Sequence, residues 1–214
     1  MSQIVETPIY TLDELSDDAK HKAREWYRQV ALSDDWFECV FEDFQRICEL
    51  LGVRLKTDSV RLFGGGTRQE PRIYFRGFWS QGDGACFEGT YSYKSGAAGS
   101  IRSYAPQDAE LHRIADALKA IQRRNFYQLH AEATHRGFYY HEYTMAISVE
   151  RDSPANQAMT EEAESIVTEA LRDLARWLYR QLEQEHQYQT SDEAVDEAIT
   201  ANGYTFTESG RRFG

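Results

Sequence analysis

Cysteine is scarce in this sequence. Three cysteines, Cys39, Cys48 and Cys86, occur in 214 residues, and no two of them have CxxC spacing. An odd number without that spacing gives no support to a disulfide framework or a zinc knuckle, so a reducing cytoplasm fits best. Long apolar runs are also missing: no window approaches the roughly 18 apolar residues of a membrane span, and the first ten residues lack a signal-peptide pattern. We therefore expect a protein that is neither exported nor inserted into a membrane.

Basic residues are in the minority. The chain has 24 Lys and Arg against 35 Asp and Glu, a formal net charge of -11. Phosphate backbones attract positive surfaces, so direct binding to nucleic acid is not expected, and a basic protein is the more favourable partner. Acids concentrate in residues 13–49 and 152–197, where the usual interpretation is a solvated helical face. The candidate residues of an acidic recognition surface are Asp34, Asp35, Glu161, Glu162 and Glu164.

Hydrophobic residues make up 41% of the chain, which is enough for one core at this length. We expect a single α+β domain over residues 1–214, with 1–10 and 209–214 loose. Capping boxes at Thr11–Glu14 and Thr190–Glu193 mark two helix starts. Helical periodicity predicts an N-terminal helix pair and a long C-terminal helix among these segments: 11–32, 33–51, 106–125, 159–187 and 190–202.

Alternating apolar residues predict an antiparallel sheet of about five strands, packed with the four to five helices. The strand segments are 53–62, 72–93, 126–133 and 138–149. Glycines 64–66 lead into another strand and therefore indicate a hairpin loop, and the small residues 94–103 indicate a mobile loop.

The most distinctive stretch is Arg72–Tyr93, RIYFRGFWSQGDGACFEGTYSY, which predicts a hairpin around the turn Gly82-Asp83-Gly84. Its aromatic residues lie on both faces, and one face meets the core. The other face is either covered by helices or exposed, and exposed aromatics with arginine are typical of protein interfaces. The candidate binding residues are Arg72, Arg76, Trp79, Ser80, Gln81 and Asp83.

An enzymatic alternative is a cysteine hydrolase. Asp83-Gly84-Ala85-Cys86 resembles the signature of ovarian-tumour-type cysteine proteases, and the resemblance implies Cys86 as nucleophile with His141 as its base. In that family the nucleophile begins a helix, whereas the residues after Cys86 alternate as a strand. Asp83 between two glycines is typical of a turn residue.

A metal or acid/base site is a further alternative. The residue types are present in His130, Glu132, His135, His141 and Glu142. Their spacing matches no metal motif. His141 lies in line with apolar residues and so fits a core histidine. We expect no metal and no cofactor.

Four segments together resemble a group of small acidic proteins of bacteriophages and mobile elements, some of which carry a toxin–antitoxin label. The segments are TLDELSDDAKHKAREWYR, DDWFECVFEDF, FRGFWSQGDGACFEGTYSY and YYHEYTMAI. The resemblance implies an accessory phage protein in the bacterial cytoplasm and no catalytic residue. Together with the charge pattern, it favours a protein that binds and inhibits a host or phage protein. Such a protein would act as an anti-CRISPR or anti-restriction factor, by acidic mimicry of DNA, or as an antitoxin-like inhibitor.

Overall fold

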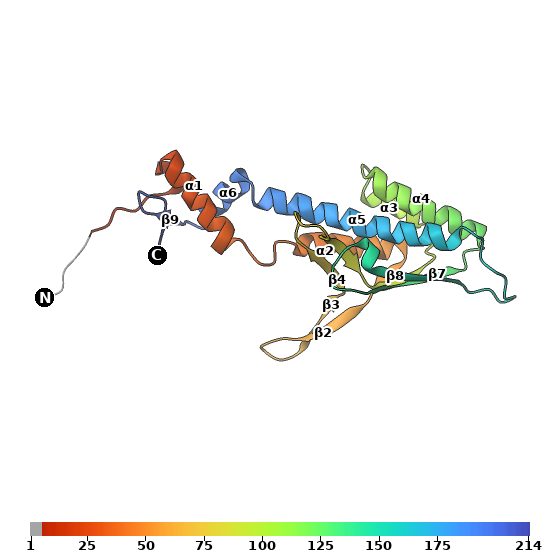
Figure 1. The fold of residues 1–214 in the computed structure, drawn as a ribbon. Helices are drawn as coiled ribbons and strands as arrows, with labels where there is room; N and C mark the ends of the chain where they lie inside the picture. Colours follow the sequence, from red (N-terminus) through yellow and green to blue (C-terminus); the bar gives the residue numbers. More distant parts are fainter. Residues whose placement is uncertain (1–5) are drawn as a thin grey trace. The chain divides into compact units, whose positions relative to one another are not determined.

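The computed structural model describes residues 6–214, which contain six α-helices and ten strands (Figure 1). The helices are α1 Asp17–Trp26, α2 Glu38–Leu51, α3 Ala97–Tyr104, α4 Ala109–Arg124, α5 Ala163–Gln189 and α6 Asp192–Ala201. The strands are β1 Val53–Leu55, β2 Thr57–Arg61, β3 Thr67–Pro71, β4 Ile73–Arg76, β5 Gly84–Phe87, β6 Gly89–Ser92, β7 Leu129–His135, β8 Met145–Arg151, β9 Thr205–Phe206 and β10 Arg212–Phe213. Their arrangement confirms the predicted α+β class, the antiparallel pairing and the long C-terminal helix.

The main sheet has four strands in the order β1-β6-β7-β8, and three further pairs form separate ribbons: β2–β3, β4–β5 and β9–β10. The chain forms two compact units, a smaller one of Met1–Glu38 and Gln184–Gly214 and a larger one of Cys39–Glu183. Helix α5 begins in the larger unit and ends in the smaller one. That both units act as a single domain stays a prediction.

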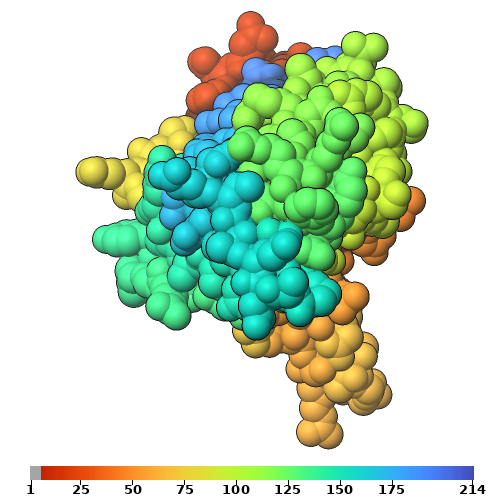
Figure 2. Space-filling view, turned by 90° about the vertical axis from the view of Figure 1, so that its right-hand side faces the viewer, coloured from red at the N-terminus to blue at the C-terminus, as the bar shows by residue number. Residues whose placement is uncertain are grey.

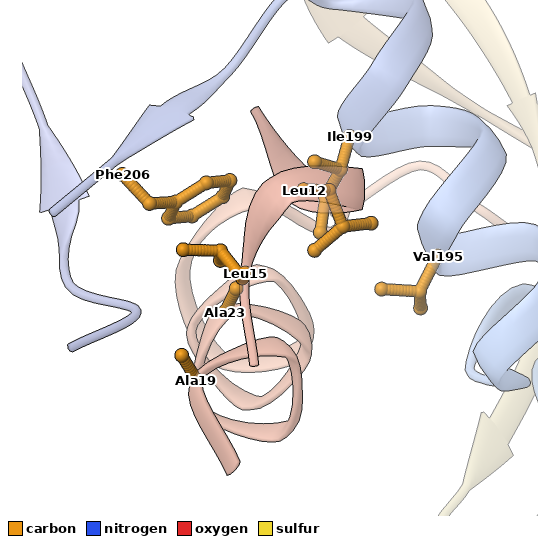
Figure 3. Packing of buried hydrophobic residues seen from close by; sticks show 7 residues of the cluster. All are labelled: Leu12, Leu15, Ala19, Ala23, Val195, Ile199 and Phe206. Carbon is orange, nitrogen blue, oxygen red and sulfur yellow. The ribbon is translucent and has the colours of Figure 1, made fainter. Parts of the chain in front are cut away.

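The smaller unit has its own core, made by the 3-10 turn at Leu12–Glu14 with Leu15 after it, by α1, by α6 and by β9 (Figure 3). Its buried residues are Leu12, Leu15, Ala19, Ala23, Val195, Ile199 and Phe206. Arg24 joins α1 to α6, because its guanidinium donates to Asp192 and Asp196. This unit therefore combines an apolar core with ion pairs at its surface.

Both capping boxes mark helical starts, with a shift. Thr11 donates its amide and its hydroxyl to the Glu14 carboxylate, at 2.8 and 2.9 Å, around a single 3-10 turn. The α-helix itself begins one turn later, where the Ser16 hydroxyl accepts from the Ala19 amide. At the second box, Ser191 rather than Thr190 caps α6.

The ends of the chain differ in part from the expectation that they are loose. Residues 1–5 lie outside the described residues. Tyr10 exchanges backbone hydrogen bonds with Phe206, and β10 pairs with β9. Tyr10 and Arg212 each pair with Phe206, so residues of both predicted loose ends are held by backbone hydrogen bonds.

In the larger unit, the main sheet buries one face and leaves the other polar. Helices α4 and α5 lie along the buried face in Figure 1. The residues that point into the core are Val53, Tyr91, Leu129, Ala131, Ala133, Met145 and Val149. Their neighbours on the opposite face include the exposed residues Arg54, Thr90 and Glu132. This alternation is the pattern of a sheet with one solvated face.

Gln122 of α4 closes the start of β7. Its side-chain amide donates to the Leu129 carbonyl at 2.7 Å, and its carbonyl accepts from the Leu129 amide at 3.2 Å. The same amide donates to the Tyr91 hydroxyl. A fully buried glutamine therefore takes the place of a neighbouring strand.

The ribbons β2–β3 and β4–β5 meet strands β1 and β6 of the main sheet at one point, so the hairpin predicted over 72–93 is right for β4 and β5 and wrong for β6. The Lys56 amide donates to the Glu88 carbonyl, the Glu88 amide to the Arg72 carbonyl, and the Arg72 amide to the Lys56 carbonyl, at 2.9, 2.9 and 2.8 Å. Strand β4 pairs with β5, but β6 leaves after Glu88 and pairs with β1 and β7. Each chain segment thus changes partner at this junction.

The ribbon β2–β3 projects from the larger unit in Figures 1 and 2, as the glycine loop 64–66 indicated. Phe63 at its tip is fully exposed. The mobile loop predicted over 94–103 is wrong for most of its length, because helix α3 begins at Ala97. Burial of Ala98 and Ile101 outweighs the low helix propensity of the glycines and serines there.

Candidate binding surface

The segment after β4 is a seven-residue loop, Gly77–Asp83, rather than a tight turn. Asp83 holds it, since one carboxylate oxygen accepts from the amides of Trp79 and Ser80 at 3.0 and 2.6 Å. Gly77 has φ +49°, and a Cβ there would lie 2.5 Å from the same carboxylate. The loop is therefore fixed from inside, and Trp79 extends outward with 82% of its surface exposed.

A second loop lies against the first one. It follows β7 and includes Phe138 and Tyr139. A Cβ on Gly82 would lie 3.2 Å from the Tyr139 ring, and a Cβ on Gly84 would lie 2.5 Å from Cβ of His141. This close approach is open only to glycine. The glycines of the predicted turn therefore serve the contact between the two loops.

Three aromatic side chains between β7 and β8 are exposed. Phe138 is 77%, Tyr139 51% and Tyr143 64% exposed. His141 fixes Tyr143, because its ring nitrogen Nδ1 accepts from the Tyr143 amide at 3.1 Å. Large apolar side chains gathered in this way are unusual on a protein that binds nothing.

Two arginines lie over these rings. The Arg76 guanidinium is 5.9 Å from the centre of the Phe138 ring, and the Arg172 guanidinium of α5 is 5.3 Å from that of Tyr143. Within residues 6–214 neither arginine has a carboxylate partner. We call the following set the aromatic–arginine surface: Arg76, Trp79, Phe138, Tyr139, Tyr143 and Arg172.

The candidate binding residues have three different surroundings. Trp79, Ser80, Gln81 and Arg76 are exposed, so they are accessible to a partner. Asp83 is half-buried and bonded to its own loop. Arg72 bridges Asp58 and Glu88 at 2.7 and 3.1 Å, and these two hydrogen bonds raise its pKa.

The sequence missed Phe138, Tyr139, Tyr143 and Arg172. The run Phe138-Tyr139-Tyr140 after Gly137 was interpreted as part of a strand with one buried face. In the structure β8 begins only at Met145, and the residues before it form a loop and the 3-10 turn Glu142–Thr144. Three adjacent aromatics after a glycine were the available signal.

The cysteine hydrolase hypothesis finds no suitable geometry here. Cys86 lies in the middle of β5 with no exposed surface, and this burial raises its thiol pKa to about 12. A nucleophilic cysteine needs the opposite shift. His141 is neither the predicted core residue nor a free base, since it is half-buried and caps the turn at Tyr143.

The histidines and glutamates considered for a metal site are spread over separate contacts. Glu132 binds Lys56 at 2.7 Å, His130 lies 3.4 Å from Glu150, and the His135 ring contacts the Tyr139 carbonyl. In the part of the chain that the structure describes, no three His, Cys, Asp or Glu side chains are grouped for a metal ion.

The predicted acidic surface is only partly free. Glu162 pairs with Arg124, and Arg176 neutralises Glu169 and Asp173 along α5. The candidates that stay exposed are Asp34, Asp35, Glu161 and Glu164. Residues 1–38 and 184–214 contain 15 acidic and 6 basic residues, against 20 and 18 in residues 39–183. Most of the net negative charge thus belongs to the smaller unit.

Comparison with known proteins gives one match. A family model described as a domain of unknown function, DUF8835, matches residues 36–192. No curated protein and no solved structure matched the chain. Among residues 6–214 there is no helix with the length and apolar character needed to cross a membrane.

Proposed function

The chain belongs to the DUF8835 family, and we propose that it is a non-enzymatic binding protein that engages another protein through the aromatic–arginine surface. One observation carries the proposal: Trp79, Phe138 and Tyr143 are each more than half exposed on two loops that pack against each other. Burying such rings in an interface is favourable, and aromatic and arginine side chains dominate binding energy where proteins meet.

The internal support of the loops strengthens this proposal. Asp83 holds the first loop, His141 the second, and glycines 82 and 84 allow the two to pack closely. A surface that is already ordered loses less conformational entropy on binding. The aromatic side chains are therefore presented on a prepared scaffold.

We place the protein in the bacterial cytoplasm as an accessory factor of a phage or mobile element that inhibits a host protein. The resemblance of the four sequence segments supports this context. Counter-defence, of the anti-CRISPR or anti-restriction type, and antitoxin-like inhibition are the two biological settings of the proposal.

In the mimicry version of this proposal, acidic helices occupy a basic groove of the target. Because Glu162 is already paired with Arg124, we assign the acidic mimic to the smaller unit, where acids outnumber bases. Charge reversal of Asp17, Asp18 and Glu193 should then weaken target binding at low salt. Reversal of Glu161 and Glu164 is the comparison, and equal binding by all variants contradicts mimicry.

Site-specific photocrosslinking tests the binding surface. A photoreactive phenylalanine analogue at Tyr139 should give a discrete crosslinked band in bacterial lysate, and the same analogue at Phe126 should not. Phe126 is 69% exposed against 51% for Tyr139, so it is at least as accessible, but it lies before β7, whereas Tyr139 lies after it. A partner that crosslinks equally at both positions, or at neither, contradicts the proposal.

A further inference from the structure

Arg172 in the middle of α5 has a cost that the fold does not explain. Its Nε is out of contact with solvent and has no hydrogen-bond partner. It is the only buried side-chain nitrogen or oxygen in this condition within residues 6–214. A buried donor without an acceptor destabilises a protein, and more so when it is charged.

The other arginines on the same helix face differ. Arg176 pairs with Glu169, Asp173 and Glu142, and Arg180 pairs with Glu110. Carboxylates near α5 are thus already bonded to other arginines. Arg172 has no carboxylate within ion-pair distance inside residues 6–214.

The ring of Tyr143 orients this free charge. The guanidinium lies 5.3 Å from the ring centre, and Tyr143 itself is held through His141. Stacking on an aromatic face fixes the plane of a guanidinium and leaves its edge available. That edge can bind a planar anion with two parallel hydrogen bonds.

We infer that Arg172 receives a carboxylate from the protein that binds the aromatic–arginine surface, so that the partner supplies an acidic segment with an adjacent apolar or aromatic residue. This rests on the proposed function. The carboxylate engages the two Nη groups, because Nε is buried. Nε stays without an acceptor, so what the partner supplies is the missing counter-charge, and its apolar neighbour packs on Tyr139 or Phe138. Arg76, which also has no carboxylate partner and lies over the Phe138 ring, adds a second positive charge to the surface.

An acidic peptide fits this surface better than a nucleic acid. Aromatic rings and arginines also bind single strands, but such strands carry a charge at every nucleotide. The larger unit has 20 acids against 18 bases, so it offers no extended positive track for a phosphate backbone. A single carboxylate beside an apolar side chain needs only the local charges of Arg172 and Arg76.

Panning a displayed library of random twelve-residue peptides on the full chain tests the inference. Enriched peptides should share an Asp or Glu next to an apolar or aromatic residue. Replacing that acid by its amide should weaken binding to the wild type at least about tenfold. Arg172→Gln should bind the acidic and the amide peptide equally weakly, whereas Arg124→Gln, which removes a paired charge on α4, should bind like the wild type.

The outcomes separate the two levels of the proposal. Peptides that need Phe138 and Tyr139 but are indifferent to Arg172→Gln overturn the acidic-partner inference and leave the binding surface standing. Peptides that bind independently of Phe138 and Tyr139 overturn the proposed function. Tight binding of a labelled oligothymidine that is lost in Arg172→Gln would show that the partner is a nucleic acid. Because the buried Nε has no acceptor, Arg172→Gln should leave the thermal unfolding temperature unchanged or raise it; a large decrease would show a structural role for Arg172 and contradict the inference.

Discussion

Cys86 is the residue whose chemistry is most fully determined by its position. Strand β5 buries it completely, and desolvation raises its thiol pKa to about 12. At neutral pH it is therefore a neutral apolar side chain that fills space in the core at strand β5. The local sequence resemblance to a hydrolase arises from Asp83, Gly84 and Cys86. Here Asp83 holds its loop and Gly84 allows the close approach of His141.

Thiol reactivity tests this. With a disulfide reagent at pH 8, the folded protein should react quickly at one cysteine, the exposed Cys39, while Cys48 and Cys86 react only after unfolding. Denaturant should raise the count to three. Fast reaction of Cys86 in the folded protein, identified by peptide mapping, would restore the hydrolase alternative.

The buried hydrogen bonds of the Gln122 side chain can be tested by substitution. Gln122→Ala leaves the amide and carbonyl of Leu129 without partners, so the free energy of unfolding should decrease by about 2–5 kcal/mol. Arg123→Ala, at the exposed neighbouring position, should change it by less than about 0.5 kcal/mol. Denaturant titration measures both, and equal stability of the two variants would contradict the role given to Gln122.

At the scale of elements, sequence periodicity predicts the long helices well. Helices α4 and α5 present regular apolar faces, and their ends lie within a few residues of the predicted ones. The sequence does not predict helix α3, because its one glycine and two serines have low helix propensity; the packing of Ala98 and Ile101 stabilises it. Sequence periodicity does not predict a helix that depends on tertiary contacts.

The junction at which β2–β3 and β4–β5 meet the main sheet is the feature that no local pattern indicates. A continuous alternating run through Glu88 looks like one strand, yet the backbone partners change there. The aromatic–arginine surface depends on this change, since it separates β5 from β6. Residues Trp79 and Arg76 were predicted from the composition of this stretch, whereas Tyr143 and Arg172 come from segments far away in sequence.

Arg72 should hold the projecting ribbon to the junction. Arg72→Met removes the hydrogen bonds to Asp58 and Glu88, so amides of β2 and β3 should exchange with deuterium faster, while those of β7 stay protected. Arg61→Met, an exposed change on the same ribbon, is the control. Unchanged exchange in β2 and β3 would show that backbone pairing alone fixes the ribbon.

At the scale of the whole molecule, the two units differ in charge and in core. The smaller one carries most of the net negative charge around a compact apolar cluster, and the larger one carries the sheet and the aromatic–arginine surface. The family match covers residues 36–192, so it falls mainly on the larger unit. Length and composition predict one domain, and whether the two compact units act as one stays a prediction.

Phe206→Ala examines how the units depend on each other. The ring is fully buried in the smaller core, so its removal should cost that unit about 3–5 kcal/mol. Hydrogen exchange should then increase in α1 and α6 and remain slow in β7. Equal loss of protection in β7 would show that the chain unfolds as the single domain expected from its length.

The central claim is that the aromatic–arginine surface binds a protein, and the affinity of the crosslinked partner tests it most directly. The purified partner should bind the double variant Phe138→Ala/Tyr139→Ala at least about 30-fold more weakly than the wild type, which corresponds to a loss of about 2 kcal/mol. Phe126→Ala, at an exposed aromatic residue elsewhere on the larger unit, should keep wild-type affinity. Equal affinity of the wild type and the double variant would contradict the account.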